Sequence, residues 1–231
     1  MNIVILTGAG ISAESGIPVF RGADGLWEGH RVEDVATPEG FKRDAQTVHE
    51  FYNRRRARLM EVVPNAAHHA LARLARESGK HVTLVTQNID DLHERAGSPE
   101  VIHMHGELLK SRCENCGAVS ECRVDLSRAS VCDACDGIDC LRPHVVWFGE
   151  MPFHLGRIER ELDRADLFMA IGTSGRVYPA AGFVKTARAA GAHTMEINLE
   201  SAGTSADFIE HRTGTAGELV PRWAEEWIPR R

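Results

Sequence analysis

Short apolar runs alternate along the chain with longer stretches in which apolar positions recur at the spacing of an α-helix. Four runs are largely apolar on successive residues, at 3–7, 82–86, 167–171 and 194–198. Continuous apolar runs of this length are typical of strands that are covered on both faces. We therefore expect a sheet with two buried faces.

Helical patterns fill the intervals between these strands. Asn65 is placed to cap a helix whose apolar positions fall on one face as far as Ala75, and a shorter helix is expected over residues 179–190. Near the C-terminus a stripe comprises Leu219, Val220, Trp223 and Trp227. Strands separated by helices predict an α/β fold with a Rossmann-like, doubly wound parallel sheet.

Two segments interrupt this alternation. Residues 108–143 are rich in Cys, Asp and Ser and poor in aliphatic residues, so apolar burial alone would not stabilise them. They are interpreted as an inserted small zinc-binding domain. Residues 23–60 form a second, helical insertion. The remaining segments, 1–22, 61–107 and 144–231, make up the large Rossmann-like domain.

Composition restricts the partners. The chain has 231 residues, 43% of them hydrophobic, and a formal net charge of −6. Phosphate binding relies on clustered Lys and Arg, so no nucleic-acid partner is expected. No apolar run approaches the ~20 residues of a membrane span, and the N-terminus lacks the basic region of a signal peptide. We expect a cytoplasmic protein with no membrane partner, and a monomer because no self-complementary apolar stripe is evident.

The cysteines have metal-ligand spacing. Cys113/Cys116 and Cys132/Cys135 are two Cys-x2-Cys pairs, fifteen residues apart, which is typical of a zinc site. Four thiolates leave no open coordination position, so such a zinc is structural. Cys140 could compete with Cys135 as the fourth ligand, although the pair spacing favours Cys135. A redox role for the pairs is the less favoured alternative. Thiols in metal spacing fit a reducing compartment.

A glycine turn follows the first strand, with the sequence Gly8-Ala9-Gly10-Ile11-Ser12-Ala13. Such glycines permit a tight turn and the approach of a phosphate to the backbone, and the following helix N-terminus offers free N–H groups to an anion. A dehydrogenase would also carry an acidic residue about 20 residues later, at the end of its second strand. Here residues 23–27 are predicted as a loop. The motif therefore predicts a nucleotide site and weakens the case for hydride transfer.

Polar residues stand at the carboxyl ends of two further strands, in Gln87-Asn88-Ile89-Asp90 and Gly172-Thr173-Ser174. Open α/β sheets bind ligands at this edge. Asn88 or Asp90 could instead cap the helix that begins near Asp91.

One histidine is a candidate general base. His105 lies just before the cysteine-rich segment, and an imidazole with a pKa near ~6.5 suits proton transfer at physiological pH. The alternatives for His103 and His105 are a zinc ligand or a hydrogen-bonded core residue.

Together these motifs resemble the sirtuin family from residue 3 to about residue 221. The resemblance also rests on Gly16-Ile17-Pro18 with Phe20-Arg21, His103-Met104-His105-Gly106, Arg142-Pro143 and Val146-Trp147-Phe148-Gly149-Glu150. It is closest to the bacterial class III members that remove acidic acyl groups, whose Tyr-x-x-Arg pair is present as Tyr52 and Arg55. It implies an NAD-dependent protein-lysine deacylase (deacetylase and desuccinylase or demalonylase). NAD is its co-substrate, it holds one structural Zn2+, and it releases nicotinamide and O-acyl-ADP-ribose.

The resemblance also implies roles for individual residues. His105 would be the general base, with Asn88 beside it as a catalytic residue. Tyr52 and Arg55 would bind a succinyl or malonyl carboxylate from one helix face. The residues implied to contact NAD are Gly8, Ala9, Gly10, Ser12, Ala13, Phe20, Arg21, Trp27, Gln87, Asn88, Ile89, Asp90, Gly172, Thr173, Ser174, Asn198, Leu199, Glu200 and Ala216. Those implied to flank the acyl-lysine peptide are Val146, Phe148, Gly149, Glu150 and Val177.

Three other functions remain open from the sequence. A dinucleotide-dependent oxidoreductase with a structural zinc predicts a reduced-cofactor absorbance change without nicotinamide release. A non-catalytic NAD or ADP-ribose sensor predicts binding that survives loss of His105, with no turnover by the parent protein. ADP-ribosyl transfer to protein would leave the label on protein.

Overall fold

The computed structural model describes residues 1–19 and 26–229. Its main sheet has the strand order β11-β10-β9-β1-β4-β5, and all neighbouring strands are parallel. The bounds are β1 Asn2–Thr7, β4 His81–Thr86, β5 Ile102–His103, β9 Leu167–Ile171, β10 His193–Asn198 and β11 Glu210–Thr213. The four strands predicted from the sequence, β1, β4, β9 and β10, are confirmed.

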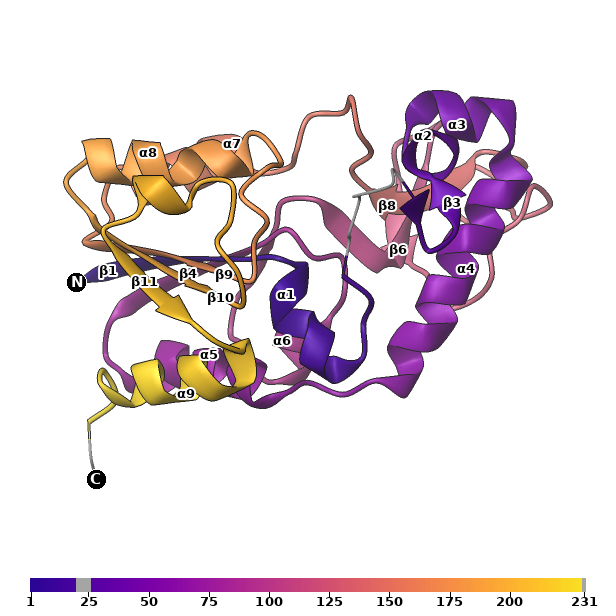
Figure 1. Ribbon diagram of the computed structural model, residues 1–231. Coiled ribbons are helices and arrows are strands. Elements are labelled where there is room, and N and C mark those ends of the chain that lie inside the picture. Colours follow the sequence, from indigo (N-terminus) through magenta and orange to yellow (C-terminus); the bar gives the residue numbers. More distant parts are fainter. Residues whose placement is uncertain (20–25, 230–231) are drawn as a thin grey trace.

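Helices cover both faces of this sheet, as a doubly wound fold requires (Figure 1). On one face lie α5 (Ala66–Glu77) and α9 (Ala216–Glu225), and on the other α7 (Leu155–Leu162) and α8 (Phe183–Ala189). Alternate side chains of β1 enter the two cores: Ile3 and Ile5 pack with α5 and α9, whereas Val4 and Leu6 pack with α7 and α8. Both faces are therefore buried, as the continuous apolar runs predicted.

The helix after Asn65 begins as its sequence predicts. The Asn65 side chain accepts a hydrogen bond from the backbone N–H of Ala67, and the ring of His68 accepts one from the N–H of Asn65. This reciprocal arrangement is a capping box with a histidine at its third position. It places the His68 ring at the helix end that faces the strand-end turns.

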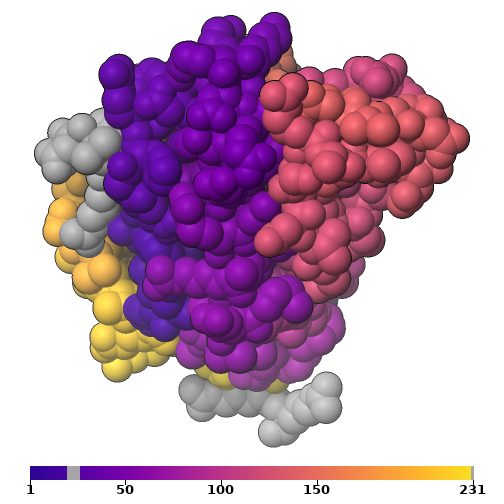
Figure 2. Space-filling view, turned by 90° about the vertical axis from the view of Figure 1, so that its right-hand side faces the viewer, coloured from indigo at the N-terminus to yellow at the C-terminus, as the bar shows by residue number. Residues whose placement is uncertain are grey.

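A second group of elements lies to one side of the main sheet. The antiparallel strands β7-β6-β8 (Val119–Glu121, Gly106–Cys113, Leu141–Val145) pack with α4 (Ala45–Glu61), α2 (Val32–Val35), α3 (Pro38–Arg43) and the β2-β3 hairpin (Leu26–Trp27, His30–Arg31). Figure 2 shows the segment that contains α2, α3 and α4 directly against the cysteine-rich segment 108–143. Both contribute to one core, which includes Phe51, Leu109 and Trp147. The division into domains at 23–60 and 108–143 stays a prediction.

The turn after β1 and the turn after β9 are in close contact. A Cβ atom on Gly8 would lie 2.7 Å from the carbonyl oxygen of Gly172, and a Cβ atom on Gly10 would lie 2.6 Å from the Cα of Gly172. Gly172 itself has φ +62°, a conformation that glycine adopts without strain. In this structure the glycines thus bring two strand-end turns together. None of the described helices has the length and apolarity needed to cross a membrane.

Candidate active site

Four sequence-predicted residues meet at the carboxyl edge of the sheet. The short helix α1 (Ala9–Ser12) and the turn at residues 87–90 are joined by hydrogen bonds. Asn88 Nδ2 donates to Ser12 Oγ (3.1 Å) and to the carbonyl of Gly8, the residue before α1 (3.1 Å). Ser12 Oγ donates in turn to Asp90 Oδ2 over 3.0 Å. The side chains of Ser12, Asn88 and Asp90 are all buried. They form a polar cluster at the edge where parallel sheets bind ligands.

Asp90 has two partners in this cluster. Its second oxygen accepts a hydrogen bond from the N–H of Leu92, the first residue of α6 (Leu92–Arg95), although the N-cap position of this helix is Asp91. Burial raises the pKa of Asp90 to about 6, although both hydrogen bonds act in the opposite direction. The carboxyl group therefore changes charge close to physiological pH.

His68 contacts Ser12, and no role was predicted for it from the sequence. Its Nε2 is 3.5 Å from Ser12 Oγ, and its ring packs edge-on against His93 with the centroids 4.9 Å apart. Burial lowers the pKa of His68 to about 4, so the ring is neutral at physiological pH. The Asn65-x-x-His68 spacing of the capping box is the signal that could have located this residue.

His105 has the geometry of a neutral base. Its Nδ1 lies 3.0 Å from the carbonyl oxygen of Gln87. A carbonyl can only accept, so Nδ1 carries the hydrogen and Nε2 keeps its lone pair. Burial lowers the pKa of His105 below the ordinary imidazole value, with the Gln87 bond acting against the shift. The ring is therefore unprotonated at physiological pH, with one nitrogen free to take a proton.

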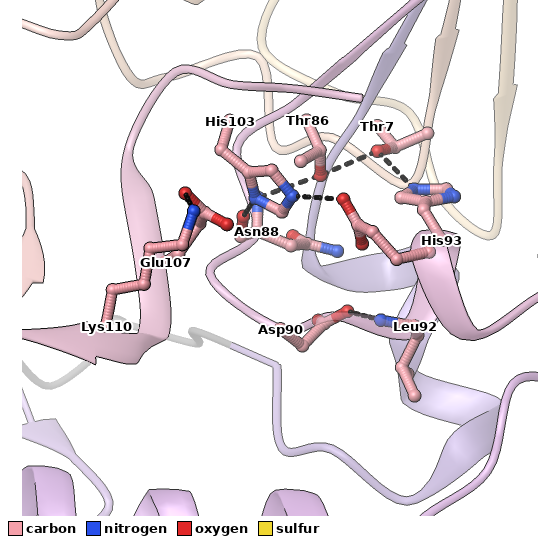
Figure 3. Close-up of polar contacts among 10 residues, drawn as sticks. Thr7, Thr86, Asn88, Asp90, Leu92, His93, His103, Glu107 and Lys110 are labelled. Atoms are coloured by element: carbon pink, nitrogen blue, oxygen red, sulfur yellow. Dashed lines mark hydrogen bonds and ion pairs between the residues drawn. The ribbon is translucent and has the colours of Figure 1, made fainter. Parts of the chain in front are cut away.

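His103 is the hydrogen-bonded, buried histidine that one of the alternatives anticipated. Its Nδ1 lies 3.2 Å from the carbonyl oxygen of Asn88 and its Nε2 lies 2.7 Å from Glu94 Oε1 (Figure 3). His103 and His105 therefore hold the carbonyls of two successive residues in the same turn.

The remaining residues implied to contact NAD are placed as follows. Asn198, at the end of β10, donates to the Thr173 carbonyl over 2.6 Å, so the turns after β9 and β10 also meet. Ala9 lies between the two glycines of the glycine turn, and Ala13 ends it. Ser174, Leu199 and Glu200 are exposed beyond their strands, and Ala216 begins α9. Trp27 lies elsewhere: the guanidinium of Arg55 is stacked 3.9 Å from the centre of its ring. Phe20 and Arg21 fall outside the described residues.

Tyr52 and Arg55 share a face of α4, as their spacing predicts. The Tyr52 hydroxyl accepts a hydrogen bond from Trp147 Nε1 (3.0 Å), and burial raises its pKa to about 12. Arg55 Nη1 lies 3.1 Å from Glu28 Oε2, and the Arg55 side chain is only 10% exposed. The pair thus presents a neutral hydroxyl and a nearly buried cation, one of whose partners is already a carboxylate.

The segment after β8 lies next to His105. The N–H of Val146 donates to the His105 carbonyl (2.8 Å), and Phe148 donates to the Ala36 carbonyl (2.9 Å). Glu150 is held by Arg142 through two bonds of 2.7 and 2.9 Å and by the N–H of Trp147. The Glu150 carboxylate therefore shapes the loop, and its contact with a substrate stays a prediction, as do those of Gly149 and Val177.

The four paired cysteines form one cluster. The sulfur atoms of Cys113, Cys116, Cys132 and Cys135 all lie within 4.8 Å of one another, with 3.7 Å between Cys113 and Cys135 and 3.8 Å between Cys116 and Cys132. Zn–S bonds of ~2.3 Å in a tetrahedron require S···S edges of about 3.8 Å. The donor set and its spacing therefore fit a structural zinc. Cys140 Sγ lies 3.5 Å from Cys113 Sγ, as close as a ligand would.

A parallel sheet with polar strand-end turns, joined to a four-thiolate unit that fits zinc, is typical of a nucleotide-binding protein with a structural metal site. The chain belongs to the Sir2 family, whose sequence profile matches residues 8–179. The NAD-dependent protein deacylase of Vibrio vulnificus strain YJ016 is 58% identical over 229 residues, which cover 98% of this chain and 94% of that protein.

Solved structures give the same result. A Sir2 homologue in complex with NAD has a TM-score of 0.89 at 42% identity, covering 97% of this chain and 88% of that one. A Sir2 variant with a deacetylated p53 peptide and 3′-O-acetyl-ADP-ribose has a TM-score of 0.83 at 31% identity, covering 99% and 94%. The sirtuin resemblance and the predicted fold class are confirmed.

Proposed function

We propose that this protein is an NAD-dependent protein-lysine deacylase that removes acetyl and acidic acyl groups and releases nicotinamide and O-acyl-ADP-ribose. The observation that carries the proposal is the state of His105: a half-buried, neutral imidazole whose Nδ1 is fixed by Gln87 and whose Nε2 has no partner among the described residues, next to the turn that carries Asn88 and Asp90. Its close relatives bear the name NAD-dependent protein deacylase.

His105 is assigned the proton transfer. In the proposed reaction the acyl oxygen attacks the ribose carbon as nicotinamide leaves, and a ribose hydroxyl then has to lose its proton. A neutral imidazole with a free Nε2 accepts that proton, and the fixed Nδ1–H stabilises the cation that forms, because it already donates to a carbonyl. Val146 lies next to this ring through its bond to the His105 carbonyl, which supports placing the peptide along 146–150.

Asn88, Ser12 and Asp90 are assigned to the nicotinamide end of NAD. Their hydrogen bonds to one another fix the Asn88 amide and the Asp90 carboxyl before any ligand binds. Preorganised polar groups of this kind stabilise developing charge without reorganisation during the reaction. The four-cysteine cluster joins β6 to the loop before β8, and a zinc there would hold together the strands that follow His105 and precede Val146.

Tyr52 and Arg55 are assigned to the acyl group. A guanidinium that is 10% exposed and stacked on Trp27 offers a strong, oriented charge to a succinyl or malonyl carboxylate. The Tyr52 hydroxyl accepts from Trp147 and keeps its own hydrogen for a second acceptor. This arrangement supports activity on acidic acyl groups in addition to acetyl.

The test uses acetyl-lysine and succinyl-lysine peptides incubated with the protein, with and without NAD, and analysed by mass spectrometry. The expected result is loss of the acyl group with formation of acyl-ADP-ribose only when NAD is present, and its abolition in His105→Ala. His193→Ala is the matched control, because His193 is the first residue of β10 and so lies at the amino ends of the parallel strands, away from the site at their carboxyl ends. A reduced nicotinamide product, label on the protein, or no NAD-dependent product from either peptide would contradict the proposal.

A further inference from the structure

His103 bridges two elements of the active site. It ends β5, its side chain is 8% exposed, and its ring lies between the carbonyl of Asn88 (3.2 Å) and the carboxylate of Glu94 in α6 (2.7 Å) (Figure 3). Neither distance leaves room for an intervening water. The ring therefore links the turn that carries Asn88 and Asp90 to the following helix.

Both partners of this ring are acceptors. A backbone carbonyl has no hydrogen to give, and the carboxylate of Glu94 offers only oxygen acceptors. To satisfy both, Nδ1 and Nε2 must each carry a hydrogen, which makes the ring an imidazolium. Burial alone lowers the pKa of His103, but the hydrogen bond and charge of Glu94, with the charge of Glu107, outweigh it and raise the pKa above its ordinary value.

The surroundings of the ring are mainly acidic. A cavity of about 180 Å³ adjoins His103, and its charged lining consists of Asp90, Asp91, Glu94, Glu107, Lys110, Glu121 and Arg123. Lys110 is paired with Glu107 over 2.8 Å, and Arg95 is paired with Asp91 over 3.6 Å. Among the described residues that line the cavity, this leaves Arg123 against Asp90, Glu94 and Glu121. His93, buried and with its pKa lowered far below the ordinary value, adds no charge. The field in this cavity thus favours the protonated ring.

In the turn that His103 contacts, three successive carbonyls each accept a hydrogen bond. The Gln87 carbonyl accepts from His105 Nδ1 (3.0 Å), that of Asn88 from His103 Nδ1 (3.2 Å), and that of Ile89 from the N–H of Leu108 (2.8 Å). Of these three donors, only His103 Nδ1 belongs to a ring in which both nitrogens have an acceptor as partner. When this ring loses one proton, it can donate to only one of its two partners. The orientation of the Asn88 amide rests on this backbone.

We propose that His103, as an imidazolium, is a positioning residue: it clamps the Asn88 carbonyl so that Asn88 and Asp90 are aligned toward NAD, and the clamp opens when His103 loses its proton. The inference rests on the proposed function, since it assigns Asn88 and Asp90 to the NAD site. After deprotonation only one nitrogen can donate; the shorter, charge-assisted bond to Glu94 keeps that hydrogen, so the bond to the Asn88 carbonyl is lost. Because the folded-state pKa is raised, the clamp is intact below it and is lost as pH rises through it, which gives activity an alkaline limb.

The test compares Glu94→Gln with Glu121→Gln. Both remove one negative charge from the same cavity, but only Glu94 contacts His103. Glu94→Gln keeps an acceptor oxygen and lowers the pKa of His103, so the alkaline limb of kcat/KM for NAD should move down by about one pH unit. Glu121→Gln should leave the limb in place. Equal shifts in the two variants, or none, would overturn the proposal.

Two readouts do not depend on turnover. The His103 ring, followed by NMR, should titrate above the ordinary imidazole pKa in the parent protein and lower in Glu94→Gln, whether or not the deacylase assignment is correct. His103→Gln should weaken NAD binding about tenfold by calorimetry, with peptide KM unchanged, as expected for loss of a charge-assisted hydrogen bond. A ring that titrates below the ordinary value, or unchanged NAD affinity in a folded His103→Gln protein, would reject the clamp.

Discussion

Arg55 and Glu28 form an ion pair inside the predicted acyl pocket, with 3.1 Å between Nη1 and Oε2. The Glu28 carboxylate is therefore already paired with the Arg55 guanidinium, which is the group that would bind a succinyl or malonyl carboxylate. Within the described residues, Nη1 has no partner at hydrogen-bond angles, so the pair is a charge contact that leaves a donor free. An acidic acyl group would compete with Glu28 for Arg55.

Replacement of Glu28 by Gln should therefore favour acidic substrates. Without the competing charge, KM for a succinyl-lysine peptide should fall about fivefold, in keeping with a partly exposed ion pair worth about 1 kcal/mol. KM for the acetyl-lysine peptide should not change. Glu33→Gln, which removes an exposed partner of Arg31, is the control. A rise in KM for the succinyl peptide would show instead that Glu28 orients Arg55 for binding.

Replacement of Arg55 by Met should separate the two activities. Met keeps the apolar packing against Trp27 and Phe51 but removes the charge that a substrate carboxylate needs. We expect desuccinylation to fall about 100-fold in kcat/KM, as for loss of a charge-assisted bond, and deacetylation to change little. Arg54→Met, one position earlier on α4, is the matched control. Equal losses on both peptides would contradict the assignment of Arg55 to the acyl group.

The acid limb of activity should lie below the ordinary imidazole pKa. Burial lowers the pKa of His105, so the base form persists as the pH falls and is lost only below the range of a free histidine. Asp90, with a pKa of about 6, titrates nearby and should make the limb steeper than a single proton would. The measurement is kcat/KM against pH for the parent protein and for Asp90→Asn. In the variant the acid limb should have the slope expected for a single proton. A limb centred above the ordinary value would contradict this account.

The sequence predicted the fold well where burial on both faces imposes a pattern. The runs at β1, β4, β9 and β10 are continuous because both faces are covered, and the structure confirms them. The edge strands β5 and β11 were not predicted, because they are short and polar: β5 has two residues and β11 is Glu-His-Arg-Thr. A strand with a single neighbour can be recognised only once that neighbour is in place.

The site could be predicted in part. Motifs at strand ends converge because parallel strands end at one edge, so the meeting of Gly8, Ser12, Asn88 and Asp90 follows from topology. The partners Glu28 and Glu94 carry no motif and reach Arg55 and His103 only through the packing of helices and loops. The roles of these residues in NAD and substrate binding stay predictions that the experiments above address.

The cysteine cluster should tolerate loss of Cys135 but not of Cys113. Cys140 is buried and its sulfur lies 3.5 Å from that of Cys113, within the edge length of a zinc tetrathiolate, whereas Cys135 is exposed. We expect Cys135→Ser to retain close to one zinc per chain, with Cys140 completing the site. Cys113→Ser and the double variant at 135 and 140 should lose the metal. Zinc content by mass spectrometry decides this, and zinc loss in Cys135→Ser alone would show that Cys140 cannot substitute.

Arg142 should be the main electrostatic determinant of stability beside the active site. It is 2% exposed, donates two bonds to Glu150, and lies 3.3 Å from the ring centre of Trp147. Although burial raises the pKa of Glu150, the bonds from Arg142 and from the N–H of Trp147 hold it below its usual value. Removal of a buried partner of this kind costs about 3 kcal/mol, because the Glu150 carboxylate loses two charge-assisted bonds and keeps only the N–H of Trp147 and the more exposed Arg112.

Arg142→Met should therefore lower the midpoint of thermal unfolding by about 10 °C in a chain of this size. Arg112→Met is the control, because Arg112 lies 3.5 Å from the same carboxylate but is 26% exposed, and its loss should cost less than about 1 kcal/mol. Since the pKa of Glu150 is depressed on folding, this contribution is present above the unfolded-state pKa and fades as the pH falls through the folded-state value. The difference between the thermal unfolding midpoints of Arg142→Met and Arg112→Met should therefore become smaller at acidic pH. An Arg142→Met midpoint equal to that of Arg112→Met at neutral pH would contradict the central role of the Arg142–Glu150 pair.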